Sequence, residues 1–327
     1  MKLLFVADPL ESFKPYKDST FAMMREAAAR GHELLACEPT DLTWQRGGRV
    51  AAPMRSFTLT GDAHRWFDET PAGSARPVAA LADVDAVLMR KDPPFDSEYF
   101  YATHLLGQAE REGARVFNSP RALRDHPEKL AILEFPQFIG PTLVTRSEAD
   151  IRRFHAEQRD IILKPLDGMG GMGIFRVGPD GMNLGSIVET LNKNGAETVM
   201  VQRYLTEITK GDKRILVIGG VPVPHCLARI PQGSEIRGNL AVGGKGVAQP
   251  LSERDREIAE AIGPVLAARG LLLVGLDVIG ECLTEINVTS PTGFQEITQQ
   301  SGVDVAKLFV DALEAALAVN ASGLDPR

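Results

Sequence analysis

The chain has 327 residues, of which 44% are hydrophobic, so it is long enough to bury a large core and to divide into two or three domains. Its 36 basic and 43 acidic residues give a formal net charge of −7, which excludes a global positive field that would attract nucleic acid or an anionic membrane. Three scattered cysteines, apolar runs too short to span a bilayer and the lack of a cleavage pattern after Asp8 predict a cytoplasmic protein with reduced thiols.

The first third of the chain has the pattern of an open α/β layer. Buried parallel strands are indicated by short apolar runs at residues 2–7, 84–90 and 114–118. Asp18 can cap a helix that ends at Gly31, and a second helix is predicted up to Gly113. We therefore predict a Rossmann-like α/β domain over residues 1–123, with ligand-binding loops at the carboxyl ends of its strands.

A change of pattern near residue 124 indicates further units. A short helix with Pro127 in its first turn is expected there, followed by the strand "TLVTR", the helix "SEADIRRFHAEQ" and the strand "DIILKPL". Later strands alternate with a glycine-rich loop at 231–246, and the helix 252–269 precedes two last strands, "LLLVGLDVIG" and "CLTEINV". The predicted units are residues 124–201, residues 202–316 and a frayed tail at 317–327.

The stretch "KPLDGMGGMGIF" (164–175) contains a match to G-x-G-x-x-G at Gly168, Gly170 and Gly173. A dinucleotide fingerprint would need a helix after the last glycine, but "IFRV" favours a strand, and no Gly-Lys-Ser/Thr follows as in a P-loop. The remaining alternatives are a flap whose backbone amides close over phosphates and a merely flexible hairpin. Because Pro165 forces Lys164 into an extended conformation, that strand can direct the ammonium toward a phosphate beneath the flap.

Polar residues on the last two strands suggest a metal site. Glu285 and Asn287 are two positions apart on one strand and so share a face, and Asp277 interrupts the preceding apolar strand. Two carboxylates and an amide oxygen are ligands that Mg²⁺ accepts. The alternative is three solvated residues on an exposed sheet face, although acids in such apolar runs need a partner.

This metal site constrains the turn between the two strands. A two-residue loop at Gly280 and Glu281 with regular pairing would place Asp277 opposite Thr284 and so away from Glu285. A shared site requires either a three-residue loop or a β-bulge, either of which pairs Asp277 with Glu285. We predict such an irregular connection.

Basic residues offer partners for a phosphate or a carboxylate. Arg214 and Arg229 lie in apolar strand-like runs, where substrate or phosphoryl contact competes with a structural ion pair. Lys129 by itself is more typical of a solvated side chain, and Asn239 lies on the long loop 231–246, which could act as a lid. Cys226 and Cys282 have no accompanying His-Asn or His-Asp set and are interpreted as small buried hydrophobes.

Six segments carry a family resemblance: "MRKDPPFD", "KPLDGMGG", "LARIPQG", "RGNLAVGGKG", "VGLDVIG" and "TEINVTSPTG". In their order and spacing the chain resembles bacterial glutathione synthetases of the ATP-grasp superfamily over roughly residues 1 to 315. "TEIN" and a lysine before a glycine loop occur across the superfamily, whereas "MRKDPPFD", "ARIPQG" and "EINVTSPT" together are much more specific to this family.

The resemblance implies an ATP-grasp fold behind an N-terminal Rossmann-like (pre-ATP-grasp) domain and a role for each site residue. It assigns metal binding (Mg²⁺, with Mn²⁺ possible) to Asp277, Glu285 and Asn287, and catalytic roles to Arg229, Arg214 and Lys164. The expected ATP-binding residues are Lys129, Lys164, Gly168, Met169, Gly170, Gly171, Gln202, Arg203, Tyr204, Leu205, Lys213 and Asn239.

The activity implied by the resemblance is ATP-dependent ligation of γ-glutamylcysteine to glycine, giving glutathione, ADP and phosphate. The expected partners are these small molecules and further copies of the chain, in a dimer or homotetramer, with no nucleic acid and no membrane. One alternative is ligation of another carboxylate and amine, such as a D-alanyl dipeptide or a glutamate tail. The other is an ATP-binding module without turnover.

Overall fold

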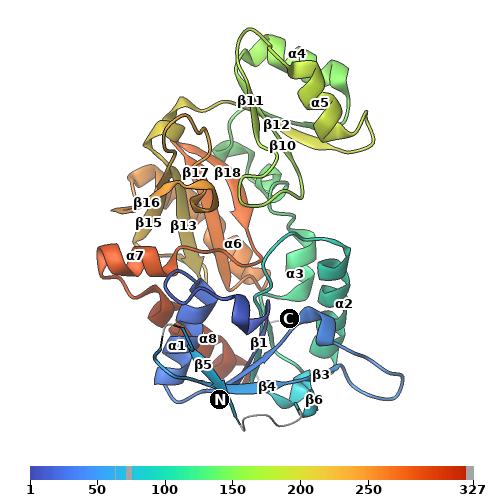
Figure 1. Cartoon of the computed structure of the whole chain (residues 1–327), viewed down its shortest axis with the longest axis vertical. Coiled ribbons are helices and arrows are strands. Elements are labelled where there is room, and N and C mark those ends of the chain that lie inside the picture. Colours follow the sequence, from blue (N-terminus) through green and yellow to red (C-terminus); the bar gives the residue numbers. More distant parts are fainter. Residues whose placement is uncertain (63, 71–75, 322–327) are drawn as a thin grey trace.

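A computed structural model describes residues 1–62, 64–70 and 76–321 of the chain. Three bodies follow one another along its long axis: the N-terminal domain at one end, a large sheet in the middle and a small sheet at the other end (Figure 1). The described ranges contain no helix of the length and apolar character that crossing a membrane requires.

The N-terminal domain contains the predicted open α/β layer. Its main sheet is formed by β1 (Lys2–Val6), β2 (Glu33–Cys37), β4 (Arg55–Leu59), β5 (Phe67–Glu69), β7 (Ala86–Met89) and β8 (Val116–Phe117). The strand order is β5-β4-β2-β1-β7-β8, with β2, β1, β7 and β8 parallel and β4 and β5 antiparallel. A separate pair is formed by β3 (Ala51–Pro53) and β6 (Val78–Ala80).

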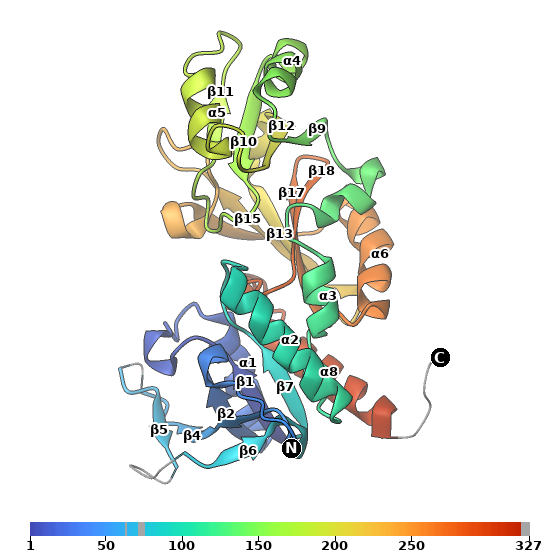
Figure 2. The same cartoon turned by 90° about the vertical axis from the view of Figure 1, so that its right-hand side faces the viewer.

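Helices cover both faces of this sheet. Along β1, Leu3 and Phe5 belong to the core beneath α1 (Ser19–Ala29) and α8 (Val305–Ala321), whereas Leu4 and Val6 belong to the core beneath α2 (Ser97–Arg111) and α3 (Pro120–Asp125). Figures 1 and 2 show α8, the last helix of the chain, beside α1. Asp18 caps α1 as predicted, since its Oδ1 accepts from the amide of Phe21 at 2.7 Å.

The predicted helix around Pro127 is wrong. The helix α3 lies earlier and begins at Pro120, because proline is well suited to a first helical position. His126 then leaves the helical region, with φ −123° and ψ 70°, since the residue before a proline is disfavoured there. Residues 128–130 form a turn before the short 3₁₀ helix η4 (Ala131–Glu134).

The small subdomain is a four-stranded antiparallel sheet covered by two helices. Its elements are β9 (Thr142–Thr145), α4 (Glu148–Gln158), β10 (Ile161–Pro165), β11 (Phe175–Val177), α5 (Leu184–Asn192) and β12 (Val199–Arg203). The strand order is β11-β10-β12-β9. Its own core includes Ile151, Leu163 and Val201, so it folds around side chains separate from those of the rest of the chain.

The large subdomain has a sheet in the order β16-β15-β13-β17-β18, with β14 paired to β13. Its elements are β13 (Asp212–Ile218), β14 (Val221–Pro222), β15 (His225–Ile230), β16 (Lys245–Pro250), α6 (Glu253–Ala268), β17 (Leu273–Ile279), β18 (Cys282–Asn287) and α7 (Phe294–Ser301).

Short 3₁₀ helices occur in all parts of the described chain. Besides η4 they are η1 (Leu10–Ser12), η2 (Pro39–Asp41), η3 (Leu81–Asp83), η5 (Pro136–Phe138), η6 (Thr206–Lys210) and η7 (Leu240–Val242). The helix α8 continues to Ala321, through the start of the expected tail, and residues 322–327 lie outside the described residues.

The connection between β17 and β18 confirms the predicted irregularity. Ile279 pairs with Cys282 across a two-residue loop, and Val278 pairs with Leu283. The register then shifts, and Asp277 pairs with Glu285. Of the two devices that the sequence allowed, the chain uses the β-bulge, with Thr284 as the extra residue.

Candidate active site

A cleft with a volume of about 330 Å³ lies between the small and large subdomains. This volume is within the range of small-molecule sites. With the exception of Lys213, every predicted site residue lines it. The structure thus brings together residues that are up to 158 positions apart in the sequence, from Lys129 to Asn287.

The glycine loop has the predicted setting of strand, loop and strand. It leaves β10 after Pro165 and enters β11 at Phe175. Gly170, Gly171 and Gly173 have backbone φ values of 59°, 88° and 70°, which residues other than glycine rarely adopt. The loop meets the predicted lid 231–246, because Arg237 Nη1 donates to the carbonyl of Gly171 at 2.9 Å.

Two buried lysines lie beneath this loop. Lys164 extends from β10 and donates from Nζ to the carbonyl of Thr284 at 3.2 Å. Burial lowers the pKa of the Lys164 ammonium, and Glu285 opposes that shift only in part. Lys129 Nζ lies 3.0 Å from Glu285 Oε1 and donates to the carbonyl of Gly168 at 2.5 Å. Lys129 is therefore a buried residue of the cleft, so the solvated alternative does not apply, and its role in binding ATP stays a prediction.

Both predicted arginines bind carboxylates of the site. Arg214 contacts Asp277 through Nε and Nη2, at 2.5 and 3.1 Å, and Arg229 Nη2 lies 2.8 Å from Asp277 Oδ2. Burial by itself would raise the pKa of Asp277, but the two guanidiniums outweigh it and hold that pKa well below its usual range. Arg229 also pairs with Asp212 at 2.5 Å. Both arginines therefore form the ion pairs that were one of the two predicted roles. The other predicted role, contact with a substrate or a phosphoryl group, stays a prediction.

The bulge places the three predicted metal ligands on one wall of the cleft. Asp277 lies opposite Glu285, and Asn287 pairs with Gly275 two positions further along. Asn287 Nδ2 donates to the carbonyl of Gly275 at 3.2 Å, which leaves the amide oxygen free to face a cation. Hard oxygen donors of this kind fit a divalent cation. No group of three or more His, Cys, Asp and Glu side chains within the described ranges has the arrangement of a metal site, so this set stays a prediction that depends on the asparagine.

Residues 202–205 form the hinge between the two subdomains, and they line the end of the cleft where β12 leaves the small subdomain. Gln202 Nε2 donates to Thr142 Oγ1 at 3.1 Å, and the guanidinium of Arg176 lies 3.7 Å from the centre of the Tyr204 ring. Arg176 itself is held by Asp160 through two hydrogen bonds of 2.9 and 2.7 Å. These contacts fix the hinge without occupying the cleft.

Lys213 is the predicted ATP-binding residue that the structure does not bring to this cleft. Because side chains alternate along β13, Lys213 points away from Arg214 and lines a second cavity with Lys210 and Glu207. Its Nζ pairs with Asp255 and donates to the carbonyl of Gly280 at 3.0 Å. A role for Lys213 in binding ATP stays a prediction without support from the geometry.

Three acidic residues of the cleft were missed from the sequence. Burial raises the pKa of Asp212 to about 6, against the influence of Arg229, and raises the pKa of Glu128, with Glu285 acting in the same direction. Alternation along β13 could have identified Asp212, which shares a face with Arg214. Asp92 belongs to the segment "MRKDPPFD", but only the fold brings it to the cleft.

The comparisons with known proteins agree across the whole chain. The sequence model described as prokaryotic glutathione synthetase, N-terminal domain, matches residues 1–124, and the one described as prokaryotic glutathione synthetase, ATP-grasp domain, matches residues 128–302. The glutathione synthetase of Ralstonia nicotianae is 61% identical over 324 residues, which cover 99% of this chain and 98% of the relative. That of Pseudomonas aeruginosa is 54% identical over 318 residues, covering 97% and 99%.

Solved structures support the fold. The D-cycloserine synthetase DcsG has a TM-score of 0.68 at 17% identity and covers 97% of this chain and 100% of its own. A RiPP-associated ATP-grasp ligase from Chryseobacterium gregarium, in complex with ADP and peptides, has a TM-score of 0.65 at 17% identity, covering 96% and 97%. With both parts of the sequence matched and full-length relatives well above half identical, the chain belongs to the prokaryotic glutathione synthetases, a family of ATP-dependent ligases with the ATP-grasp fold.

Proposed function

We propose that the chain joins the cysteine carboxylate of γ-glutamylcysteine to the amine of glycine with consumption of ATP, releasing glutathione, ADP and phosphate. One observation carries the proposal: two buried lysines and two buried arginines converge in a single cleft beneath a glycine loop. A concentration of positive charge of this kind suits phosphoryl transfer to a carboxylate.

In the first step, the substrate carboxylate attacks the γ-phosphorus of ATP and ADP leaves, giving an acyl phosphate. Adenine would pack against residues 202–205, with the triphosphate beneath the amides of the glycine loop. Lys129 and Lys164 would neutralise the charge of the phosphate oxygens. Burial lowers the pKa of the Lys164 ammonium, and the anionic phosphates would oppose that effect and keep the ammonium charged. Asp277, Glu285 and Asn287 would hold a divalent cation, Mg²⁺ or Mn²⁺, which supplies further charge neutralisation to the phosphates.

In the second step, the glycine amine attacks the acyl carbon, and phosphate leaves from a tetrahedral intermediate. Arg229 would bind the negative oxygen of that intermediate through its planar guanidinium, while Arg214 keeps Asp277 in place. Closure of the glycine loop and the lid 231–246 on each other would exclude water, which would otherwise hydrolyse the acyl phosphate.

A product assay tests this function directly. Purified enzyme with γ-glutamylcysteine, glycine and Mg-ATP should release phosphate and form glutathione in equal amounts. Phosphate release only with D-alanine or with glutamate as the amine would favour the other ligases of the superfamily. If no pair of carboxylate and amine released phosphate, although ATP bound, the chain would be a nucleotide-binding module.

The scattered cysteines support the proposed location, and the family resemblance supports the proposed assembly. We infer a cytoplasmic enzyme that assembles as a dimer or homotetramer. Light scattering coupled to size-exclusion chromatography measures the mass of the assembly. A mass of one chain at working concentration would contradict a dimer or a tetramer.

A further inference from the structure

The hinge borders two cavities. Arg203, Tyr204 and Leu205 line the cleft, and the same three residues line the second cavity, which has a volume of about 790 Å³. The amide of Arg203 donates to the carbonyl of Pro141 at 3.0 Å, and the carbonyl of Leu205 accepts from the amide of Ile208 at 3.2 Å. Because a segment beside open space gains less support from apolar packing, its position depends more on contacts of this kind.

The middle hinge residue, Tyr204, is held to the small subdomain in two ways. Its amide donates to the carbonyl of Asp160 at 2.9 Å, and its ring centre lies 3.7 Å from the guanidinium of Arg176. The carboxylate of Asp160 in turn accepts from Nε and Nη2 of Arg176, at 2.9 and 2.7 Å. Two parallel hydrogen bonds fix the plane of a guanidinium, so Asp160 also sets the face that Arg176 presents to the ring.

Arg176 extends from the side of the small sheet that faces the cleft. Cross-strand pairing forms a row of four residues over β11, β10, β12 and β9, namely Arg176, Ile162, Gln202 and Thr142. Residues directly opposite each other share a face of a sheet, and Ile162 and Gln202 line the cleft. The core of the small subdomain lies on the other face, where the neighbouring Val177 is buried. Arg176 therefore supports the cleft side of the sheet and not that core.

The hinge offers two backbone groups to a ligand. Among the residues that the structure describes, neither the carbonyl of Tyr204 nor the amide of Leu205 forms a hydrogen bond. The first group accepts and the second donates. Adenine has the complementary pair, since its 6-amino group donates and its N1 accepts, whereas hypoxanthine accepts at its 6-oxygen and donates from N1. Backbone groups held in place can therefore distinguish the two bases.

We propose that Arg176 and Asp160 are positioning residues for recognition of the base: they hold Tyr204 so that its carbonyl and the amide of Leu205 meet the edge of adenine. Arg176 acts through the ring of Tyr204, and Asp160 acts through Arg176 and the amide of Tyr204. The assignment rests on the proposed function, since it takes adenine to pack against residues 202–205.

The test measures binding of adenosine diphosphate (ADP) and inosine diphosphate (IDP) by titration calorimetry with Mg²⁺, which requires no turnover. Wild-type enzyme should bind ADP at least about thirtyfold more tightly, because IDP would leave both hinge groups unpaired. Arg176→Met keeps an unbranched side chain and removes the charge. It should weaken ADP binding by about tenfold, as a cation–π contact partly shielded from water implies, and change IDP binding by less than about twofold. Asp160→Asn should reduce the preference for ADP in the same direction.

A double-mutant cycle tests whether Arg176 acts through the ring. Tyr204→Leu removes that ring, so adding Arg176→Met to it should weaken ADP binding by less than about a further twofold. Arg152→Met is the control, because Arg152 belongs to the same subdomain, pairs with Glu148 and has a side chain that is 55% exposed. It should bind both nucleotides as wild-type enzyme does.

Several results would overturn the assignment. Unchanged ADP affinity in Arg176→Met, equal losses for ADP and IDP, or additive effects of Arg176→Met and Tyr204→Leu would each do so. Equal binding of ADP and IDP by wild-type enzyme would also do so, and that result needs no variant to fold. If wild-type enzyme bound neither nucleotide, the proposed function itself would fail, which is a distinguishable outcome.

Discussion

Lys164 has the least favourable setting of the basic residues that the proposed mechanism uses. It is 6% exposed, it shares Glu285 with Lys129, and burial lowers the pKa of its ammonium. A buried charge of this kind is unfavourable without an anionic partner, so an interaction with ATP phosphates would contribute both affinity and charge neutralisation in the transition state.

We therefore expect Lys164→Ala to weaken ATP binding and to lower turnover by at least a hundredfold, about 2.7 kcal/mol. Steady-state kinetics with varied ATP provide the measurement. Lys193→Ala is the matched control, because that lysine belongs to the same subdomain but is 66% exposed and pairs with Glu197. If Lys164→Ala had kinetics close to those of the control, Lys164 would not be a residue that binds the ATP phosphates.

At the scale of single elements, the turn between β17 and β18 was predictable and several other features were not. The turn follows from alternation and from the residues available for the loop, which are properties of adjacent sequence. The partners of Arg214 and Arg229 depend on contacts between strands that are distant in the sequence. The strand β16 was missed because the glycine-rich segment gives no apolar alternation, and it forms by pairing with β15.

The contact between the glycine loop and the lid leads to a prediction about protection from hydrogen exchange. The side chain of Arg237 in the lid donates a hydrogen bond to the carbonyl of Gly171 and so joins the two segments. We expect amides of residues 167–173 and much of 231–246 to exchange rapidly without nucleotide and to become protected when Mg-ATP binds. Amides of β12 should exchange slowly in both states and serve as the reference. Equal protection of the two segments with and without nucleotide would contradict closure on ATP.

A third prediction concerns the helix α2 and its packing. Burial raises the pKa of Glu110 to about 7, although Arg124 and Arg111 oppose the shift. Because the pKa in the folded chain is above that of the unfolded chain, the protonated form is favoured by folding, and this stability is lost as the pH rises through about 7. Glu110→Gln should therefore raise the free energy of unfolding by about 1 to 2 kcal/mol more at pH 8 than at pH 5, after allowance for screening by water.

Urea unfolding at the two pH values measures this difference. Glu98→Gln provides the comparison, since Glu98 lies exposed on the first turn of the same helix. A stabilisation by Glu110→Gln of the same size at both pH values would show that burial of the carboxylate is not its cause.

At the scale of the whole molecule, the two ends of the chain are joined by α1 and α8. One apolar core contains Phe5 of the N-terminal sheet, Leu216 of the large subdomain and Phe309 of α8. The N-terminal domain and the ATP-grasp body therefore share side chains, and this shared core holds Asp92 against Ser290 at the end of the cleft. We expect both bodies to unfold together.

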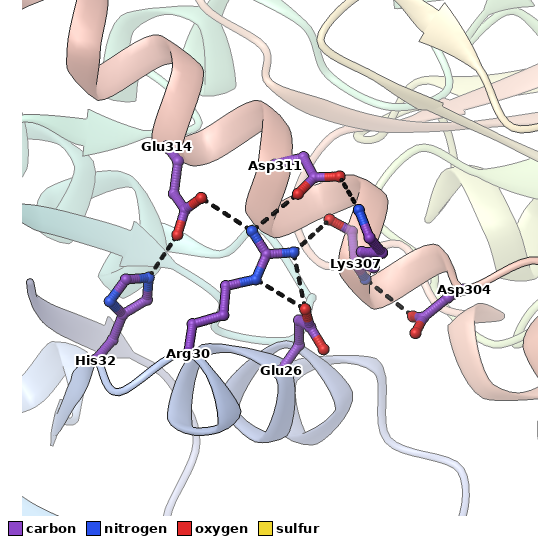
Figure 3. Close-up of polar contacts among 7 residues, drawn as sticks. All are labelled: Glu26, Arg30, His32, Asp304, Lys307, Asp311 and Glu314. Atoms are coloured by element: carbon purple, nitrogen blue, oxygen red, sulfur yellow. Dashed lines mark hydrogen bonds and ion pairs between the residues drawn. The ribbon is translucent and has the colours of Figure 1, made fainter.

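An ion cluster closes this contact on its outer side, formed by Glu26, Arg30, His32, Asp311 and Glu314 (Figure 3). Arg30 is its centre: it contacts Glu26 at 2.8 Å within α1 and reaches Asp311 at 2.8 Å and Glu314 at 2.9 Å on α8. The Arg30 side chain is only 21% exposed, so these pairs are less screened than ordinary surface pairs.

The last prediction uses Arg30→Met, which keeps the apolar stem and removes the charge. We expect the free energy of unfolding to fall by about 1 to 2 kcal/mol at low salt and by less at high salt. Arg121→Met, with a partner on its own helix and a side chain 84% exposed, should change it by less than about 0.5 kcal/mol. Both tryptophans, Trp44 and Trp66, belong to the N-terminal domain, so fluorescence follows that domain while far-ultraviolet circular dichroism follows the whole chain. If α8 couples the two bodies, Arg30→Met shifts both transitions by the same amount; a shift in only one of them would mean that the shared core does not make the chain a single cooperative unit.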